Sequence, residues 1–427
     1  MLELKDVNFR LCKYRIDSII LTVPGVDPYQ INTLGIADWV IEKDFDQYQY
    51  PYFRVTVGVP NNVFRAMRKN YDNIQAYVRI MYAYFKPQET VGAPGVKVRE
   101  NVYLAGNFIV LMEDSSPHFT TEPEEITERQ TLPKEGTPDF QNMTTVEILL
   151  YKQKDLNIIK KNPRVVYHNA TLIDILTDYL RKIKLSNVLC SPPDNNMKRY
   201  PQFVLPPLRA DEQILRICCD YGMHKYGTTL FFDFDKTYII NKVNKCTAWT
   251  PNEYKTIYVI NPNLATQVGT TLQGCSYESA DRCGYCTMVD AKASAASIER
   301  EQVFGTSFEA IDKHTGKHHE VNTNAVTVKG GGNISRVMGS YDGEVSTYHA
   351  LKQRIEEESC VMTVVLDGID LTMLEPNKQF CLTFISPKLK KYNRFYRLVR
   401  YTTSFIANDG QWFAPTVLAT FVGKKPE

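Results

Sequence analysis

The sequence contains no long apolar run and no export signal. No apolar stretch approaches the roughly 18 to 20 residues that cross a bilayer, and the amino-terminal residues lack the basic-then-apolar pattern of a signal peptide. We therefore expect no membrane anchor and a protein that is made and kept in the cytosol until it is assembled or released.

The charges almost cancel. The 427 residues hold 50 Lys and Arg against 48 Asp and Glu, which gives a formal charge of +2. Bulk electrostatics therefore favour neither nucleic acid nor a membrane surface as a partner, and any contact with DNA has to be local.

The ten cysteines lack the regular spacing of a disulfide framework, and most lie in apolar runs. Without an export signal, buried reduced thiols are the favoured interpretation. One group has metal-ligand character, because thiols two residues apart can share a tetrahedral zinc that imidazoles complete. Its members are Cys275, Cys283, Cys286, His314, His318 and His319. The long gap between the second thiol and His314 favours a plain loop, so zinc stays an alternative and no cofactor is predicted.

Hydrolase signatures are missing as well. The chain contains neither G-x-S-x-G nor H-E-x-x-H. Asp233 and Asp235 form a carboxylate pair, but they fall in an expected hairpin where alternate side chains face solvent. Gly330, Gly331 and Gly332 lack the Lys-Ser/Thr of a phosphate loop. We therefore predict that the chain is not an enzyme.

Basic and aromatic residues alternate near the carboxyl end, as in a nucleic-acid-binding stripe. A solvated strand face is the commoner cause, although the same residues would attract phosphates if they lined a channel. The stripe consists of Lys388, Lys390, Lys391, Arg394, Arg397 and Arg400 with Tyr392, Tyr396 and Tyr401.

Strand patterns dominate both ends of the chain. The composition includes 26 Tyr and 20 Phe, which favours strands. Residues 1–160 predict a first β-barrel domain, with strands at 18–23, 53–59, 76–85, 103–112 and 144–151 and a Pro-rich surface loop at 114–142. Residues 345–427 predict a helix at 347–358 and a second β-barrel with a tight turn at 408–410.

The middle of the chain reads differently. Residues 161–243 predict a small α/β module, in which the apolar period of 3.6 marks helices near 172–183 and 214–221, followed by a hairpin at 229–241. Residues 244–344 read as an irregular, partly β insertion or linker. The fold class is thus mainly β with an α+β insert, two β-barrels being joined by the small α/β domain.

Two segments resemble the tail hub family of phages and contractile injection machines, which includes the T-even baseplate hub, the late-control gene D proteins and the amino-terminal part of type VI spike proteins. The first is NATLIDILTDYLRKIKL followed by FVLPPLRADEQILRICCDYGMHKYGTTLFFDFDKTYIIN. The second is VVLDGIDLTMLEPNKQFCLTF with RFYRLVRYTTSFIANDGQWFAPTVLATFV. Pro376-Asn377 stands where the family has Pro-Gly, a mild departure because Asn also adopts left-handed backbone.

The resemblance implies a structural hub in the virion tail or baseplate, assembled in the host cytoplasm. It implies a homotrimeric ring that adapts a sixfold tail tube to a threefold central or cell-puncturing spike, a role that an isologous dimer cannot fill. Baseplate wedge and tape-measure proteins are expected partners, with contacts in the Pro-rich loop and in 244–344, and DNA is expected to pass through the lumen without specific binding. A tail-tip enzyme or zinc protein centred on the Cys/His group, and a receptor- or glycan-binding tail protein, remain alternatives.

Overall fold

The computed structural model describes most of both ends of the chain and parts of the region between residues 242 and 359. The described residues are 2–3, 11–33, 36, 38–46, 50–85, 99–112, 143–193, 197–221, 223–224, 228–241, 254–260, 271–272, 283–295, 308–312, 318–321, 340–341, 360–376, 378–384, 388–406 and 412–424. The protein is mainly β, as predicted. No helix among these residues has the length and apolarity needed to cross a membrane.

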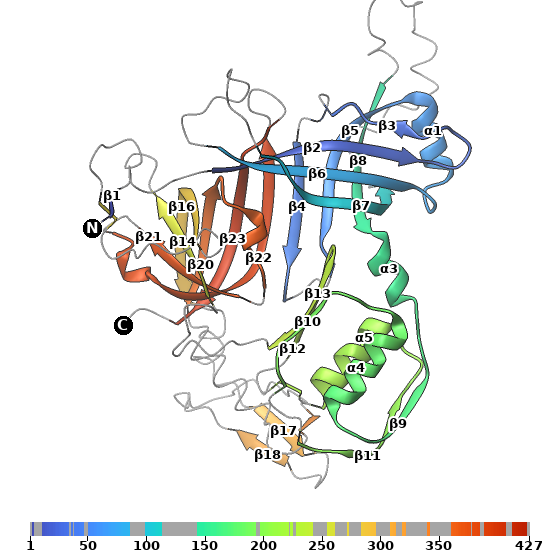
Figure 1. The fold of residues 1–427 in the computed structure, drawn as a ribbon, viewed down its shortest axis with the longest axis vertical. Coiled ribbons are helices and arrows are strands. Elements are labelled where there is room, and N and C mark those ends of the chain that lie inside the picture. The colour runs from blue at the N-terminus through green and yellow to red at the C-terminus, as the bar shows by residue number, and fades with distance from the viewer. Residues whose placement is uncertain are drawn as a thin grey trace, which may run out of the picture.

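One 13-stranded sheet runs through both ends of the chain (Figure 1). Its first half comes from the amino-terminal region, where alternate side chains are buried, as β5 shows over nine residues. The elements of this half are β2 (Leu11–Thr22), β3 (Tyr29–Gln30), β4 (Asp38–Asp44), β5 (Tyr52–Pro60), α1 (Asn61–Lys69), β6 (Gln75–Phe85), β7 (Asn101–Met112) and β8 (Met143–Lys152).

The second half is built mostly from the carboxyl-terminal region. β21 pairs with both β14 and β22, so the pairing of its six strands returns to the strand from which it started. Its elements are β14 (Tyr254–Ile260), β16 (Cys283–Ala295), β20 (Cys360–Asp367), a 3-10 turn (Leu371–Met373), β21 (Gln379–Phe384), a second 3-10 turn (Lys390–Tyr392), β22 (Arg394–Ile406) and β23 (Pro415–Gly423).

The two halves repeat one strand order. In the part of the chain that the structure describes, each half has six strands longer than two residues, which can be numbered one to six along the chain. In the sheet, strands two, three, six, five and four lie side by side in that order, and each adjacent pair is antiparallel. These are β4-β5-β8-β7-β6 and β16-β20-β23-β22-β21. The first strand pairs with the fourth in both halves, antiparallel for β2 with β6 and parallel for β14 with β21. A short helical segment follows the third strand in both, namely α1 and the turn at Leu371–Met373.

The halves differ in how their edges meet. Among the described residues β2 and β4 do not pair, so the first half is an open sheet, and β4 pairs instead with β22 of the second half. The two halves therefore share one continuous sheet. The arrangement of the two halves as two barrels remains a prediction.

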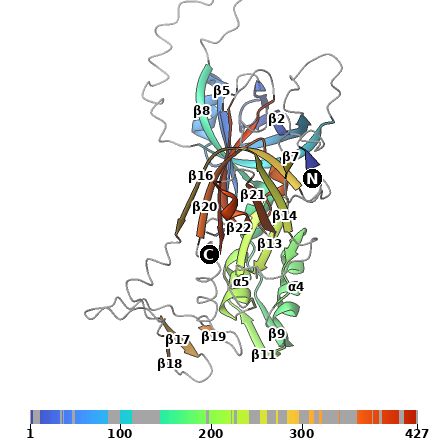
Figure 2. The ribbon, with the colours of Figure 1, turned by 90° about the vertical axis from the view of Figure 1, so that its left-hand side faces the viewer.

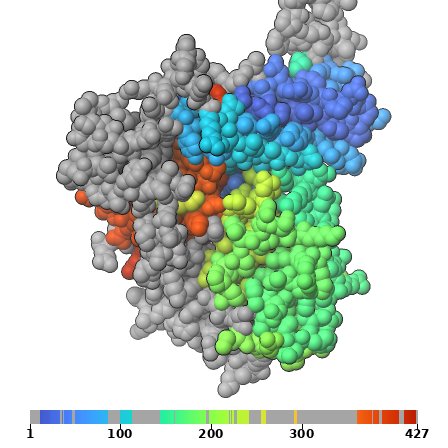
Figure 3. Space-filling view, viewed as in Figure 1, coloured from blue at the N-terminus to red at the C-terminus, as the bar shows by residue number. Residues whose placement is uncertain are grey.

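The α/β module lies beneath the sheet (Figure 2 and Figure 3) and has its own hydrophobic core. Its elements are α3 (Gln153–Ile159), β9 (Val165–Ala170), α4 (Leu172–Ile183), β10 (Val188–Cys190), β11 (Tyr200–Leu205), α5 (Ala210–Leu215) with a π-helical continuation (Arg216–Asp220), β12 (Thr228–Asp233) and β13 (Lys236–Asn241). The bounds of α4 match the prediction. A capping box between Thr171 and Asp174 begins this helix, and Lys184 in left-handed backbone ends it.

Some elements differ from the sequence prediction. The second helix begins at Ala210, earlier than expected, and changes to π-helical geometry at Arg216. Helix α1, which the sequence analysis did not predict, begins at Asn61 directly after Pro60. Four other predictions lie outside the described residues: the loop at 114–142, the glycines at 330–332, the helix at 347–358 and the turn at 408–410.

Short strands outside the main sheet occur in the segment predicted as partly β. β17 pairs with β18 and β19, and β15 pairs with β1. Their bounds are β1 (Leu2–Glu3), β15 (Thr271–Leu272), β17 (Phe308–Asp312), β18 (His318–Val321) and β19 (Ser340–Tyr341).

Candidate functional site

The β12–β13 hairpin connects the α/β module to the main sheet. Lys43 on β4 forms a 2.5 Å ion pair with Asp233 at the end of β12, and the exposed fractions of the two side chains are 6% and 15%. Phe45 packs edge-to-face on Phe231 beside this pair. Asp233 thus pairs with a buried lysine instead of facing solvent, which corrects the sequence-based expectation for this residue.

The ammonium of Lys43 is held in an aromatic enclosure. It lies 5.1 Å from the ring centre of Phe234 and 5.8 Å from that of Tyr401. Burial alone lowers a lysine pKa, but the carboxylate of Asp233 outweighs burial and raises the pKa of Lys43 above its ordinary value. Lys43 therefore stays charged, and the pair joins two parts of the chain separated by 190 residues.

A second set of charges surrounds helix α3, which leads from β8 into the module. Lys152 at the end of β8 pairs with Asp235 of the hairpin at 3.2 Å. Asp155 on α3 is only 6% exposed. Burial raises its pKa to about 7, against the opposing effect of Lys152 and Lys154 and with the support of Asp233 and Asp235.

Glu375 makes a third connection from the other half of the sheet. Its carboxylate forms ion pairs with Lys236 of β13 at 2.8 Å and with Lys255 of β14 at 3.3 Å. Burial favours the neutral acid, yet these two lysines hold the pKa of Glu375 below its usual range. The same hairpin thus contacts both halves of the sheet.

The two halves also meet around Asp370. Tyr84 of β6 donates a 2.5 Å hydrogen bond to its carboxylate, and Tyr14 of β2 donates a longer one at 3.4 Å. Backbone bonds reinforce this contact, since the Cys12 amide donates to the Gly368 carbonyl and Tyr14 exchanges two bonds with Phe413. The free edge of β2 is therefore occupied by the carboxyl-terminal part of the chain.

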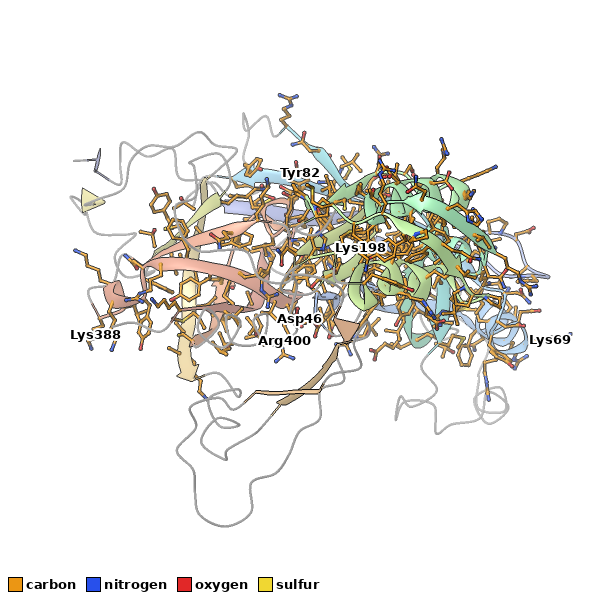
Figure 4. The ribbon with its side chains drawn as sticks, turned by 90° about the horizontal axis from the view of Figure 1, so that it is seen from below. Asp46, Lys69, Tyr82, Lys198, Lys388 and Arg400 are labelled. Atoms are coloured by element: carbon orange, nitrogen blue, oxygen red, sulfur yellow. The ribbon has the colours of Figure 1, made fainter. Side chains whose placement is uncertain are left out.

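The basic stripe predicted from the sequence is divided in the structure. Arg397 is only 7% exposed and makes two hydrogen bonds to Asp46, at 3.2 and 3.3 Å, and Tyr396 and Tyr401 are buried. Lys388, Lys390, Lys391 and Arg400 are exposed. Figure 4 shows Lys388 at one end of the molecule and Arg400 near its middle, close to Asp46. The predicted stripe is therefore not one continuous surface, because some of its residues are buried and the exposed ones lie in different parts of the molecule.

We expect Arg397→Leu to destabilise the protein by roughly 2 kcal/mol, because it leaves the carboxylate of Asp46 without its paired cation. Arg400→Leu serves as the matched control, because Arg400 is exposed and its loss should cost less than about 0.5 kcal/mol. Urea denaturation of both variants measures the difference. Equal costs would contradict a structural role for the Arg397–Asp46 pair.

The Cys/His group is only partly described. Cys283 and Cys286 belong to β16 of the main sheet, whereas His318 and His319 belong to β18 of a separate three-stranded sheet. Cys275 and His314 lie outside the described residues, so zinc binding stays an untested alternative. Within the described part of the chain, no three His, Cys, Asp or Glu residues are grouped as metal ligands.

Exposed apolar side chains gather on the two-stranded sheet of the module. Val166 of β9 and Val204 of β11 are directly paired, and their exposed fractions are 48% and 50%. The opposite face of the same strands packs on the module core through Phe203 and Leu205. The two paired valines thus form a small exposed apolar surface on the side of this sheet that faces away from the core.

Sequence reasoning did not find the ion pairs at the hairpin or around α3. The segment FFDFD predicted the hairpin that contains Asp233. Lys43 lies 190 positions from Asp233 in the sequence, and no local pattern connects these two residues. The lysines at 152, 154, 160 and 161 are a local concentration of positive charge, which is the sequence signal that marks this region.

Comparison with known proteins gives weak structural likenesses and a family match. A tail protein from Neisseria meningitidis MC58 aligns with 9% identity over 95% of this chain and 96% of its own, with a TM-score of 0.46. The 43 kDa tail protein of prophage MuSo2 from Shewanella oneidensis aligns with 11% identity over 94% and 97%, with a TM-score of 0.43. A component of the E. coli type VI secretion system aligns with 9% identity over 95% and 77%, with a TM-score of 0.44.

No curated protein matches the chain. A family model does match it, over residues 12–416, and this model describes the Bacteriophage PBS1 gene 109 protein. The match takes in both halves of the sheet and the module between them. The resemblance to phage proteins that the sequence indicated is confirmed. The chain belongs to the Bacteriophage PBS1 gene 109 protein family.

Proposed function

We propose that this chain is a structural hub of a phage tail or baseplate, in which three copies form a ring. The observation that carries the proposal is the repeated strand order of the two sheet halves. A chain that contains two similar β units presents two similar surfaces, so three chains present six. Such a ring can meet a sixfold tube on one side and a threefold spike on the other.

The pairing pattern supports two barrels for each chain. In the second half, the circuit β14-β16-β20-β23-β22-β21 returns to β14. In the first half, the gap between β2 and β4 is spanned by the carboxyl-terminal hairpin, since Phe413 pairs with Tyr14 on one side and β22 pairs with β4 on the other. We propose that the second unit completes the first in this way, through β22 on one side and the bridge at Phe413 on the other. This sharing would fix the angle between the two barrels.

The expected partners follow from this geometry. We propose the tail tube protein and a central or cell-puncturing spike as direct neighbours, with baseplate wedge and tape-measure proteins nearby. DNA would pass through the lumen without specific binding, in keeping with the near-neutral charge of +2. The role is assembly without catalysis, carried out in the virion tail after folding in the host cytoplasm.

The central test is the oligomeric state and the shape of the assembly. We expect light scattering after size exclusion to give the mass of three chains, alone or after addition of the tail tube protein. Electron microscopy of the same fraction should show a ring with a central hole. A chain that remains monomeric at high concentration and does not join tail tube protein would overturn the proposal.

A further inference from the structure

An open hollow of about 460 Å³ lies where β7, the end of β8, helix α3 and the end of α4 meet. Half of the eight residues that line it are lysines: Lys152, Lys154, Lys161 and Lys184. The other four are uncharged, so no acidic side chain lines this part of the described surface. Figure 1 shows α3 between the first half of the sheet and the module, where these segments converge.

The side chain of Lys152 is held in a fixed position in the hollow. Only 7% exposed, it donates a 2.8 Å hydrogen bond to the Ala105 carbonyl, and its ammonium lies 5.0 Å from the ring centre of Phe108. Gly106 makes this seat possible, since its φ is +142° and a Cβ there would lie 2.7 Å from the ammonium nitrogen. The fold therefore places one cation at the base of the hollow.

The other three lysines come from two separate segments. Lys161 donates to the Ile183 carbonyl at 2.7 Å, and Lys154 donates to the Ser186 hydroxyl at 3.2 Å. An ammonium has three N–H groups, so each of these lysines keeps donors for a ligand. The bonds to α4 and its following turn hold both stems near the opening.

The local charge is strongly positive although the whole chain is almost neutral. Four lysines line the hollow. Of the acids that act in the same place, Asp155 is buried, Asp233 pairs with Lys43 and Asp235 pairs with Lys152. Cations held this close repel one another, and a bound anion relieves that repulsion. The hollow is thus suited to an anionic ligand.

We propose that this hollow binds the carboxylates of an acidic segment on a neighbouring protein. All four cations are lysines, which attract the carboxylates of a flexible acidic chain as point charges, without the fixed two-bond geometry that an arginine fork requires of a carboxylate or a phosphate. Asn107, Asn157 and Ile158 add amide and apolar contacts of the kind found at protein interfaces. The choice of a protein partner rests on the hub function proposed above; the anion-binding property does not.

A labelled hexaglutamate peptide provides the test, with fluorescence anisotropy on the full chain at low salt. We expect the peptide to bind, hexaglutamine not to bind, and Lys154→Gln/Lys161→Gln/Lys184→Gln to weaken binding by about tenfold or more. Lys388→Gln/Lys390→Gln/Lys391→Gln is the matched control, because it removes the same charge from exposed lysines of the other half. This control should bind the peptide as the parent does.

Two results would overturn the proposal. Equal weakening in both triple variants would show that the peptide senses only net charge. Tighter binding of a hexathymidine oligonucleotide than of hexaglutamate, lost in the first triple variant alone, would show that the hollow serves phosphates instead. The peptide assay does not depend on oligomerisation. A chain that binds the peptide, stays monomeric at high concentration and does not join tail tube protein would therefore refute the hub and leave the site standing.

Discussion

Asp233→Asn is expected to destabilise the protein by about 3–5 kcal/mol, because it leaves the buried ammonium of Lys43 without a counter-charge. The two atoms are 2.5 Å apart and both side chains are largely buried, so solvent does not screen the loss. Chemical denaturation followed by tryptophan fluorescence measures the change. The reason for the large effect is burial: the same pair at the surface would contribute less than about 1 kcal/mol.

Two further variants test whether the loss of stability comes from breaking the Lys43–Asp233 ion pair or from any Asp-to-Asn substitution in this hairpin. Asp235→Asn makes the same substitution two residues later, where the side chain is 61% exposed, and should cost only about 1 kcal/mol because Lys152 keeps its bond to Ala105. The double variant Lys43→Met/Asp233→Asn removes both charges and should recover about 2 kcal/mol of the single-variant loss. If Asp233→Asn costs no more than Asp235→Asn, the pair does not hold the module to the sheet.

The second large effect is a pH dependence caused by Asp155. The folded protein holds this proton up to a pKa of about 7, whereas the unfolded chain releases it near 3.8. The folded state therefore binds more protons between these values, and the free energy of unfolding falls as pH rises from about 4 to 7. Above pH 7 the ionised, buried carboxylate carries its full cost, which is roughly 2–4 kcal/mol.

Asn cannot ionise, so Asp155→Asn should be more stable than the parent at pH 8 and close to the parent at pH 4. Asp174→Asn in the next helix is the control with the opposite sign. Hydrogen bonds from Thr171 lower the pKa of Asp174, so its contribution is present at neutral pH and lost in acid. Urea titrations of all three proteins at pH 4, 5 and 8 make the comparison, and the Asp174 control is also measured near pH 2 because its contribution is lost only below its ordinary pKa of 3.8. A stability difference between Asp155→Asn and the parent that does not change with pH would show that burial does not raise this pKa.

These effects share a location. Lys43, Asp155 and Asp233 all lie where the module meets the first half of the sheet, next to the lysine hollow. In the hub proposed above, the module would keep a fixed angle while partners bind around it. Buried ion pairs lose their energy when their geometry changes, so these pairs would help to fix that angle.

The local patterns were sufficient where one segment determines its own structure. The apolar period in 172–183 predicted helix α4 at its observed bounds, because a capping box and a left-handed end residue terminate it from within the sequence. Alternation predicted β5, β6, β7 and β8 closely, because one face of each is buried. Helix α1 was not predicted, because Pro-Asn-Asn at 60–62 fits a turn and the first turn of a helix equally well.

The sequence by itself determined the mainly β class, the position of the module between two β regions and the phage resemblance, because periodicity and turn residues act over a few positions. Only the tertiary structure decided how the halves join through β4 and β22, which acids face buried lysines, and that four lysines from 152 to 184 surround one hollow. Such contacts connect residues distant along the chain. Their energies depend on burial and distance, which no local pattern encodes.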